Sequence, residues 1–136
     1  MGYVKVKADI ANPAEKSRKV SLDCLVDTGA IYTMVPRSTL EKLHAQVSGR
    51  RRFKLANGNV EEFQIGEAYI EVQGVGATSI VVFGPEESQP LLGVTTLENL
   101  GLQVNPVTGE LKPLELYLLQ MRPFMLPLGD EQKAKD

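Results

Sequence analysis

Short stretches in which apolar and polar residues alternate run through most of the chain, and Gly, Pro or Asn residues separate them. Alternation of this kind places every second side chain on one face, which is typical of half-buried β-strands. Residues 3–12 and 18–29 show the pattern most clearly, and Asn12-Pro13 marks a turn after the first of them. These two segments therefore predict an antiparallel hairpin.

The same reading predicts further strands and two short helices. The strands are expected at residues 31–35, 51–63 (a hairpin), 68–74, 78–84 and 102–114 (a last hairpin). Asn57-Gly58 marks the turn of the first of these hairpins, because both residues tolerate a positive φ. Many short strands joined by such turns indicate an all-β barrel or sandwich.

The helices are expected at residues 38–44 and 94–100. Ser38 and Glu41 have the spacing of a capping box, and so do Thr95 and Glu98. Gly101 stands where a C-terminal capping glycine belongs. Both helices are short, so the class stays all-β.

Length and charge exclude several classes of protein. A chain of 136 residues fits one domain, and a net charge of −2 gives no general attraction to nucleic acid or to an anionic membrane. No apolar run is long enough to cross a membrane, and one histidine without a Cys/His cluster argues against a metal site. The single cysteine excludes an intrachain disulfide, and the first residues lack a secretory signal. These features predict a cytoplasmic protein.

The segment Leu-Val-Asp-Thr-Gly-Ala at residues 25–30 is the candidate site. In this segment a run of apolar strand-forming residues ends in the carboxylate of Asp27. Burial of a carboxylate costs free energy unless the group is hydrogen-bonded or paired, so an Asp at this position suggests a function. Leu91-Leu92-Gly93 follows 64 residues after Asp27 and leads directly into the second expected helix. Asp27 could also be a turn-capping residue in an inert barrel. The second motif at this distance favours the catalytic interpretation.

From about residue 5 to residue 111 the chain resembles the retroviral-type, retropepsin-like aspartic proteases. The shared pattern is an apolar pair, Asp-Thr-Gly-Ala, a flap hairpin, a Gly-Pro turn, and two apolar residues with Gly before a helix. The resemblance implies a closed barrel with a flap hairpin. It implies a protease domain over residues 1–112 and a C-terminal extension over residues 113–136. That extension would be an apolar segment followed by a disordered tail.

The resemblance also implies roles for individual residues. Asp27 would be catalytic, and Thr28, Gly29 and Ala30 would support its loop. Substrate would be held by the flap and floor residues Leu55, Ala56, Asn57, Gly58 and Asn59. Leu91, Leu92 and Gly93 would support the site from below. An unfolded protein or peptide would be the substrate, and neither a metal nor an organic cofactor would be needed.

Hydrolysis of a peptide bond by this route requires two carboxylates. One must take a proton from water while the other gives a proton to the carbonyl oxygen of the peptide bond. Asp27 alone among the aspartates is followed by Thr-Gly or Ser-Gly. Asp23 is about 13 Å away along an extended strand, too far to share a proton. The sequence therefore predicts a homodimer with one Asp27 from each copy at its axis. The alternative is a dimeric peptide-binding or assembly domain that kept the fold without useful turnover.

Two features depart from the viral pattern. The expected flap tip, residues 56–59, has one glycine where viral proteases have a glycine-rich tip. Residues 114–128 are longer and more apolar than the chain ends that viral dimers interleave. This segment would either build the dimer interface or cover the substrate groove.

A few other residues have competing interpretations. The run Arg50 to Arg52 is either a nucleic-acid patch or, as the acidic net charge favours, a solvated approach to the flap. His44 is expected at an exposed helix end, and Cys24 as a buried structural thiol. Tyr32 packs either in the wall of the site or in the core.

Overall fold

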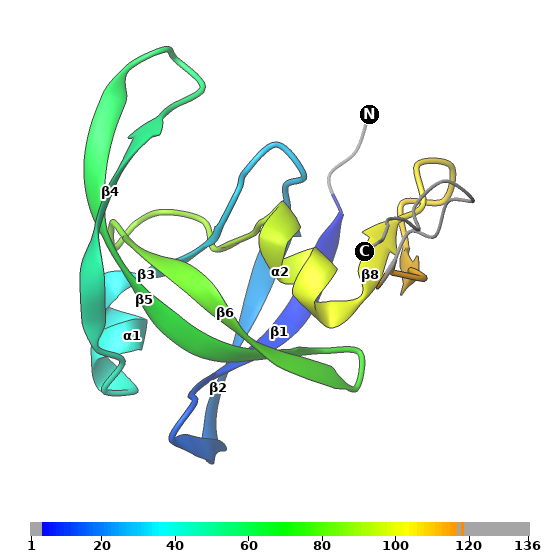
Figure 1. Ribbon diagram of the computed structural model, residues 1–136, viewed down its shortest axis with the longest axis horizontal. Coiled ribbons are helices and arrows are strands. Elements are labelled where there is room, and N and C mark those ends of the chain that lie inside the picture. Colours follow the sequence, from blue (N-terminus) through cyan, green and yellow to red (C-terminus); the bar gives the residue numbers. More distant parts are fainter. Residues whose placement is uncertain (1–3, 117, 119–136) are drawn as a thin grey trace, which may run out of the picture.

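The computed structural model describes residues 4–116 and residue 118, and strands dominate this part of the chain (Figure 1). The strands are β1 (Lys5–Asn12), β2 (Glu15–Val26), β3 (Thr33–Pro36), β4 (Val47–Lys54), β5 (Val60–Val72), β6 (Val75–Gly84), β7 (Leu91–Leu92), β8 (Leu102–Val104) and β9 (Leu111–Pro113). The helices are α1 (Arg37–Lys42) and α2 (Val94–Leu100). The predicted all-β class with two short helices is confirmed.

The main sheet closes into a ring. Its strand order is β1-β2-β7-β3-β6-β5-β4. A further pairing of β1 with β5 closes the first six of these strands into a ring. Strand β4 lies outside the ring because it pairs with β5 alone. The ring is irregular, since β7 has two residues and meets β3 through the single pair Met34 and Leu91. It is therefore a closed but uneven barrel.

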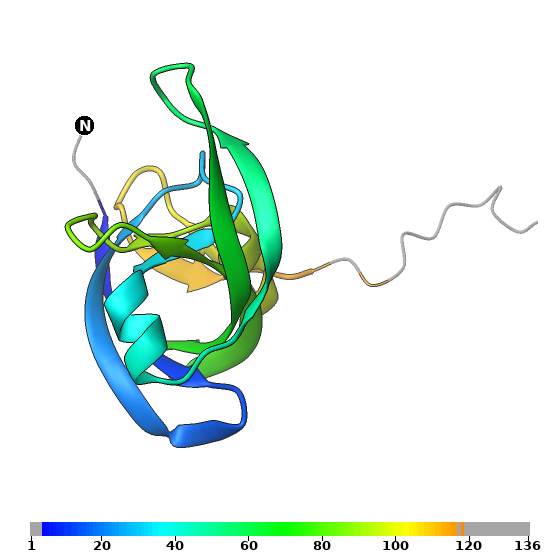
Figure 2. The same cartoon turned by 90° about the vertical axis from the view of Figure 1, so that its left-hand side faces the viewer.

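The three predicted hairpins are present. Strands β1 and β2 pair antiparallel, as do β4 with β5 and β8 with β9. The β4–β5 hairpin projects beyond the ring, at the same end of the molecule as the light-blue loop between β2 and β3 (Figures 1 and 2). This arrangement puts the expected flap and the expected catalytic loop on one side.

One strand boundary was predicted wrongly. Residues 51–63 and 68–74 were expected to contain separate strands, but β5 runs without a break from Val60 to Val72. The only turn-forming residue between the two segments is Gly66. A Cβ at Gly66 would lie 2.4 Å from the carbonyl oxygen of Gln46, so glycine serves close strand packing at this position.

Both predicted capping boxes are wrong, whereas the capping glycine is right. Helix α1 begins after Pro36, and helix α2 begins after Gly93, without a side-chain cap in either. The amide of Ser38 instead donates to the carboxylate of Glu86 at 2.7 Å. Hydrogen bonding by the Ser38 side chain, and then by this amide, lowers the pKa of Glu86. Gly101 ends α2 with a φ of 70° in the left-handed region that favours glycine.

The core fills the ring and extends to both helices. Its fully buried members include Ile10 of β1, Ile70 of β5 and Leu92 of β7, with Leu40 of α1 at one side. Cys24 has no exposed surface, as predicted, and burial raises the pKa of its thiol to about 12. The loop that follows β2 therefore rests on a closed apolar base.

Candidate active site

The loop between β2 and β3 presents Asp27. The Asp27 amide donates to the carbonyl oxygen of Leu92 at 2.9 Å, which ties the start of the loop to β7. The Ala30 amide donates to the carbonyl oxygen of Asp27 at 3.1 Å and closes a tight turn. The Gly29 amide donates to the Asp27 carboxylate at 2.9 Å. The loop therefore fixes both the backbone and the side chain of Asp27.

Asp27, Thr28 and Gly29 are exposed in the single chain, and Ala30 is half-buried. A Cβ at Gly29 would lie 3.3 Å from the nearer carboxylate oxygen of Asp27, which is tighter than most real contacts. Glycine at this position leaves the carboxylate accessible from solvent while its own amide stays bonded to it. A second surface can thus approach the carboxylate.

Leu91, Leu92 and Gly93 lie directly beneath this loop. Leu91 and Leu92 form β7, which pairs in parallel with Leu25 and Val26 of β2. A Cβ at Gly93 would lie 2.4 Å from the carbonyl carbon of Tyr32, so only glycine allows this approach. The structure therefore brings the two sequence motifs together, although Asp27 and Leu91 lie 64 positions apart.

A buried set of hydroxyl groups holds the loop from the other side, and the sequence reasoning missed it. The hydroxyl of Thr33 donates to that of Thr96 at 2.6 Å and accepts the Gly93 amide at 3.0 Å. The Ser79 hydroxyl lies 2.8 Å from that of Thr96, and the Asn99 amide group donates to Ser79 at 3.3 Å. The available signal was weak: a threonine inside the apolar run of residues 31–35.

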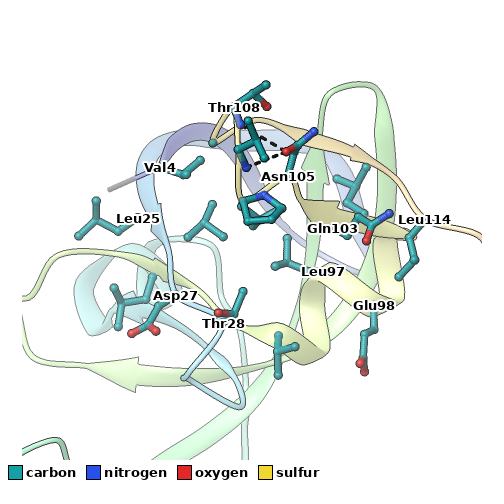
Figure 3. Close-up of a pocket in the computed structure, with 18 residues that line it drawn as sticks. Val4, Leu25, Asp27, Thr28, Leu97, Glu98, Gln103, Asn105, Thr108 and Leu114 are labelled. Carbon is teal, nitrogen blue, oxygen red and sulfur yellow. Dashed lines mark hydrogen bonds between the residues drawn. The ribbon is translucent and has the colours of Figure 1, made fainter. Parts of the chain in front are cut away.

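A pocket of about 1160 Å³ lies beside Asp27, between the loop, α2 and the β8–β9 hairpin (Figure 3). Asp27, Thr28 and Leu91 line it, whereas the expected substrate residues 55–59 do not. The other carboxylate in the lining is that of Glu98, which extends from the opposite side of the pocket (Figure 3). Within the described residues, Asp27 therefore has no second carboxylate beside it in the same pocket.

The tip of the β4–β5 hairpin has the turn that Asn57-Gly58 predicted. Gly58 has a φ of 88°, its amide donates to the carbonyl oxygen of Leu55, and the Asn57 side chain accepts the Asn59 amide. Ala56, Asn57, Gly58 and Asn59 are exposed, and Leu55 is half-buried. The tip thus stands clear of the ring, on the side of the Asp27 loop (Figure 2).

Strand β4 of the same hairpin contacts Tyr32 in the half nearer the tip. The rings of Tyr32 and Phe53 meet edge to face with their centroids 6.0 Å apart, and Arg51 donates to the Tyr32 hydroxyl at 3.3 Å. Tyr32 is therefore half-buried between the loop and the hairpin rather than in the core. The arginines alternate along β4, and Arg50 pairs with Glu62 at 3.6 Å, so the run does not form one basic patch.

The described part of the chain contains no group of three or more His, Cys, Asp or Glu side chains that could hold a metal ion. Residues 4–116 and 118 also include no helix long and apolar enough to cross a membrane. His44 is exposed just after α1, where it was predicted, with a φ of 61°.

Comparisons with known proteins agree with this geometry. Residues 16–99 match the family described as "gag-polyprotein putative aspartyl protease". The fold is similar to the solution structure of the simian foamy virus (mac) protease, with a TM-score of 0.51 and 20% identity over 69% of this chain and 91% of that one. A search of curated proteins found no relative.

A second solved structure is the foamy viral protease–reverse transcriptase in complex with an RNA/DNA hybrid. It has a TM-score of 0.55 and 16% identity, over 85% of this chain and 13% of that much longer one. At these identities the likeness shows the retropepsin-like fold. Because the family match covers more than half of the sequence, this chain belongs to the gag-polyprotein aspartyl protease family.

Proposed function

We propose that the chain is an aspartic endopeptidase whose active site is completed by a second copy. The observation that carries this proposal is the Asp27 carboxylate, held by the Gly29 amide at 2.9 Å and exposed on a loop that is braced from below. A residue fixed this firmly, yet open to solvent, is prepared to meet a partner group. The family and the fold support the same chemistry.

Among the described residues no second carboxylate lies beside Asp27, so in this proposal the second carboxylate comes from another copy of the chain. Asp23 is exposed and its carboxylate lies 3.7 Å from the Lys7 ammonium, and Glu98 extends from the far side of the pocket. A twofold axis near the loop would place two copies of Asp27 side by side, with Thr28 of each copy bracing the other loop. Ile31, in the same loop, is 53% exposed and would be covered in such a dimer.

Two carboxylates at short range cannot both ionise, so the pair shares one proton, as is established for aspartic proteases. The ionised member takes a proton from water, and the protonated member gives its proton to the carbonyl oxygen of the peptide bond. The two titrations belong to the pair. Small Ala30 leaves room for the substrate main chain beside the carboxylates.

The β4–β5 hairpin would be the flap. Residues 55–59 at its tip would close over an extended peptide, which would add a strand to the hairpin edge and exclude water. We assign the protease domain to residues 1–112 and an extension to residues 113–136. No metal or organic cofactor takes part in this reaction.

Cleavage of an unstructured protein by the wild type and by Asp27→Asn, from about pH 3 to 7, tests the proposal. Asp23→Asn is the matched control, because it removes an exposed carboxylate four residues earlier, on the strand that leads to Asp27. Fragments identified by mass spectrometry should appear with the wild type and the control, and not with Asp27→Asn. Mixing wild type with excess Asp27→Asn should also lower activity, because mixed dimers lack one carboxylate.

Two outcomes would redirect the proposal. A folded wild-type dimer that yields no fragments, with or without residues 117–136, would indicate a peptide-binding domain on the same fold. Activity that does not fall when Asp27→Asn is mixed in would contradict a shared site. Sedimentation velocity on each sample gives the oligomeric state independently of turnover.

A further inference from the structure

We propose that Tyr32 is a positioning residue that ties the β4–β5 hairpin to the Asp27 loop. Its kinetic consequence rests on the proposed protease function, whereas its structural consequence rests on contacts within one chain. Tyr32 lies five positions after Asp27 and immediately before β3. It therefore belongs to the loop by its backbone and contacts the hairpin by its side chain.

The side chain of Tyr32 makes two different contacts with the hairpin. Its ring meets Phe53 at 6.0 Å between centroids with an interplanar angle of 82°, an arrangement favoured by aromatic pairs. Phe63, from the opposite strand, continues the cluster with its ring centroid 6.1 Å from that of Phe53. The Tyr32 hydroxyl accepts a hydrogen bond from Arg51 at 3.3 Å. One side chain thus contacts apolar and charged residues of the hairpin.

The hairpin register shows that this contact uses one face. Arg51 and Phe53 point to the same side of β4 because side chains alternate, and Phe63 stands opposite Arg51 on β5. Arg50 and Arg52 belong to the other face, where Arg50 pairs with Glu62. The face of Arg51, Phe53 and Phe63 is therefore the one turned toward the Asp27 loop.

The backbone of Tyr32 is fixed independently of the hairpin. Its carbonyl group lies so close to Gly93 that a Cβ there would come within 2.5 Å of the Tyr32 oxygen. The neighbouring Ile31 carbonyl accepts the Thr95 amide at 3.1 Å, and the Thr33 hydroxyl accepts the Gly93 amide. Because the backbone is held on both sides of Tyr32, only the Tyr32 side chain can adjust its contact with the hairpin. The contact at Phe53 and Arg51 lies in the half of the hairpin nearer its tip, because Phe53 pairs with Glu61 one step before the last pair, Lys54 with Val60.

The consequence is that the height of the hairpin tip above Asp27 is set before substrate arrives. Without the Tyr32 contacts, the free hairpin would sample more positions, and a peptide would have to order it on binding. The chemistry at Asp27 would be unchanged once the peptide is bound. Loss of Tyr32 should therefore raise KM more than it lowers kcat.

The test uses hydrogen exchange of the full chain, followed by mass spectrometry on peptides that cover residues 47–66. Tyr32→Ala should raise exchange of these amides by about 2- to 10-fold, the range expected for an aromatic contact. Tyr32→Phe keeps the ring and should give a smaller rise, similar to that of Arg51→Met. Arg50→Met is the matched control, because it removes the adjacent arginine from the opposite face, and it should change little.

The kinetic arm measures KM and kcat on the same variants. Tyr69→Phe is the control, because it removes a tyrosine hydroxyl far from the loop, on β5. Tyr32→Ala should raise KM by about 2- to 10-fold with kcat within about twofold of the wild type. If Tyr32→Ala does not fold, Tyr32→Phe, Arg51→Met and their double variant still measure the coupling.

Unchanged exchange in Tyr32→Phe, Arg51→Met and Tyr32→Ala would overturn the inference, and so would an equal rise in Arg50→Met. An equal fall in kcat and kcat/KM would also overturn it, because Tyr32 would then act on the chemistry. Absence of any cleavage by the wild type would contradict the proposed function alone. The exchange result would still decide the structural part.

Discussion

The hydroxyl of Thr33 accepts a hydrogen bond from the amide of Gly93 at 3.0 Å, although the two residues lie 60 positions apart. Thr33 begins the strand after the Asp27 loop, and Gly93 precedes the helix after β7. The same hydroxyl donates to Thr96, so both its donor and its acceptor functions are used in a site without solvent. This one side-chain oxygen therefore adds to the backbone bonds, such as that from the Asp27 amide to the Leu92 carbonyl oxygen, which join the two halves of the candidate active site.

Thr33→Val should destabilise the fold by about 1–3 kcal/mol, the usual cost of leaving a buried polar group unpaired. Valine has nearly the same shape, but it cannot accept the Gly93 amide. Urea unfolding followed by circular dichroism measures the loss, with Thr78→Val on the exposed face of β6 as the control. Equal midpoints for the two variants would show that the hydroxyl network contributes little.

Gly93→Ala should destabilise the chain by about 1–3 kcal/mol and lower cleavage, because the added methyl group meets the Tyr32 backbone at 2.4 Å. Backbone atoms cannot turn aside as a flexible side chain can, so the loop itself would have to move. Gly49→Ala on β4 is the control, since a Cβ there meets nothing within 4 Å. Thermal unfolding and fragment yield should change together in Gly93→Ala only.

Stability should fall as pH rises from about 9 toward 12, partly through Cys24. The folded pKa of this thiol is about 12, above its ordinary value of 9.0, because burial disfavours the thiolate. Above pH 9 the unfolded chain loses this proton while the folded chain keeps it, so unfolding is favoured.

Comparison with Cys24→Ala isolates this contribution from that of other groups that titrate at high pH. The wild type should lose stability more steeply than Cys24→Ala between pH 9 and 12. If the urea midpoints of the two proteins fell equally with rising pH, the predicted contribution of Cys24 would be contradicted. Below pH 9 the difference between them should be constant.

A chain that ends after Leu116 should keep the fold, with its free energy of unfolding within about 0.5 kcal/mol of the full chain. The ring strands all lie between Lys5 and Leu92, and Leu114 still donates its amide to Gly101 at 2.8 Å. The predicted apolar segment beyond Leu116, apart from residue 118, and the predicted tail lie outside the described residues. Calorimetry of the two chains checks the prediction.

Activity of the shortened chain then separates the two roles proposed for the extension. A loss of dimer in sedimentation, together with a loss of cleavage, would assign residues 117–128 to the interface. A rise in cleavage with the dimer intact would assign them to the substrate groove. A large loss of stability would show instead that the ring depends on them.

Local signals in the sequence predicted much of the fold. Alternation gave the strands, and Asn57-Gly58 and Gly101 gave a turn and a helix end, because the backbone conformation there depends on the residue itself. Asp27 and Leu91 could be paired in advance only through a family pattern. Their parallel strands β2 and β7 are joined by a pairing that no local feature encodes.

The errors arose where a remote residue replaces a local one. Ser38 and Glu41 have the spacing for a capping box, but the Ser38 amide donates its hydrogen bond to the carboxylate of Glu86, 48 positions away. The partners of Thr33 and the contacts of Tyr32 are remote in the same way. A single threonine in an apolar run looks the same whether its hydroxyl is bonded in a core or exposed.

Strand β5 belongs to two structures at once. Its first half, up to Gly66, pairs with β4 in the hairpin, and its second half, from Ile65, pairs with β6 in the ring. The hairpin is therefore a projecting arm that continues directly from a ring strand, and any bending of this arm relative to the ring would occur at Ile65 and Gly66. Any force that a bound peptide exerts on the tip would be carried by a continuous backbone into the seam between β5 and β1. Stiffness at that seam, far from Asp27, would then set how tightly the arm can close.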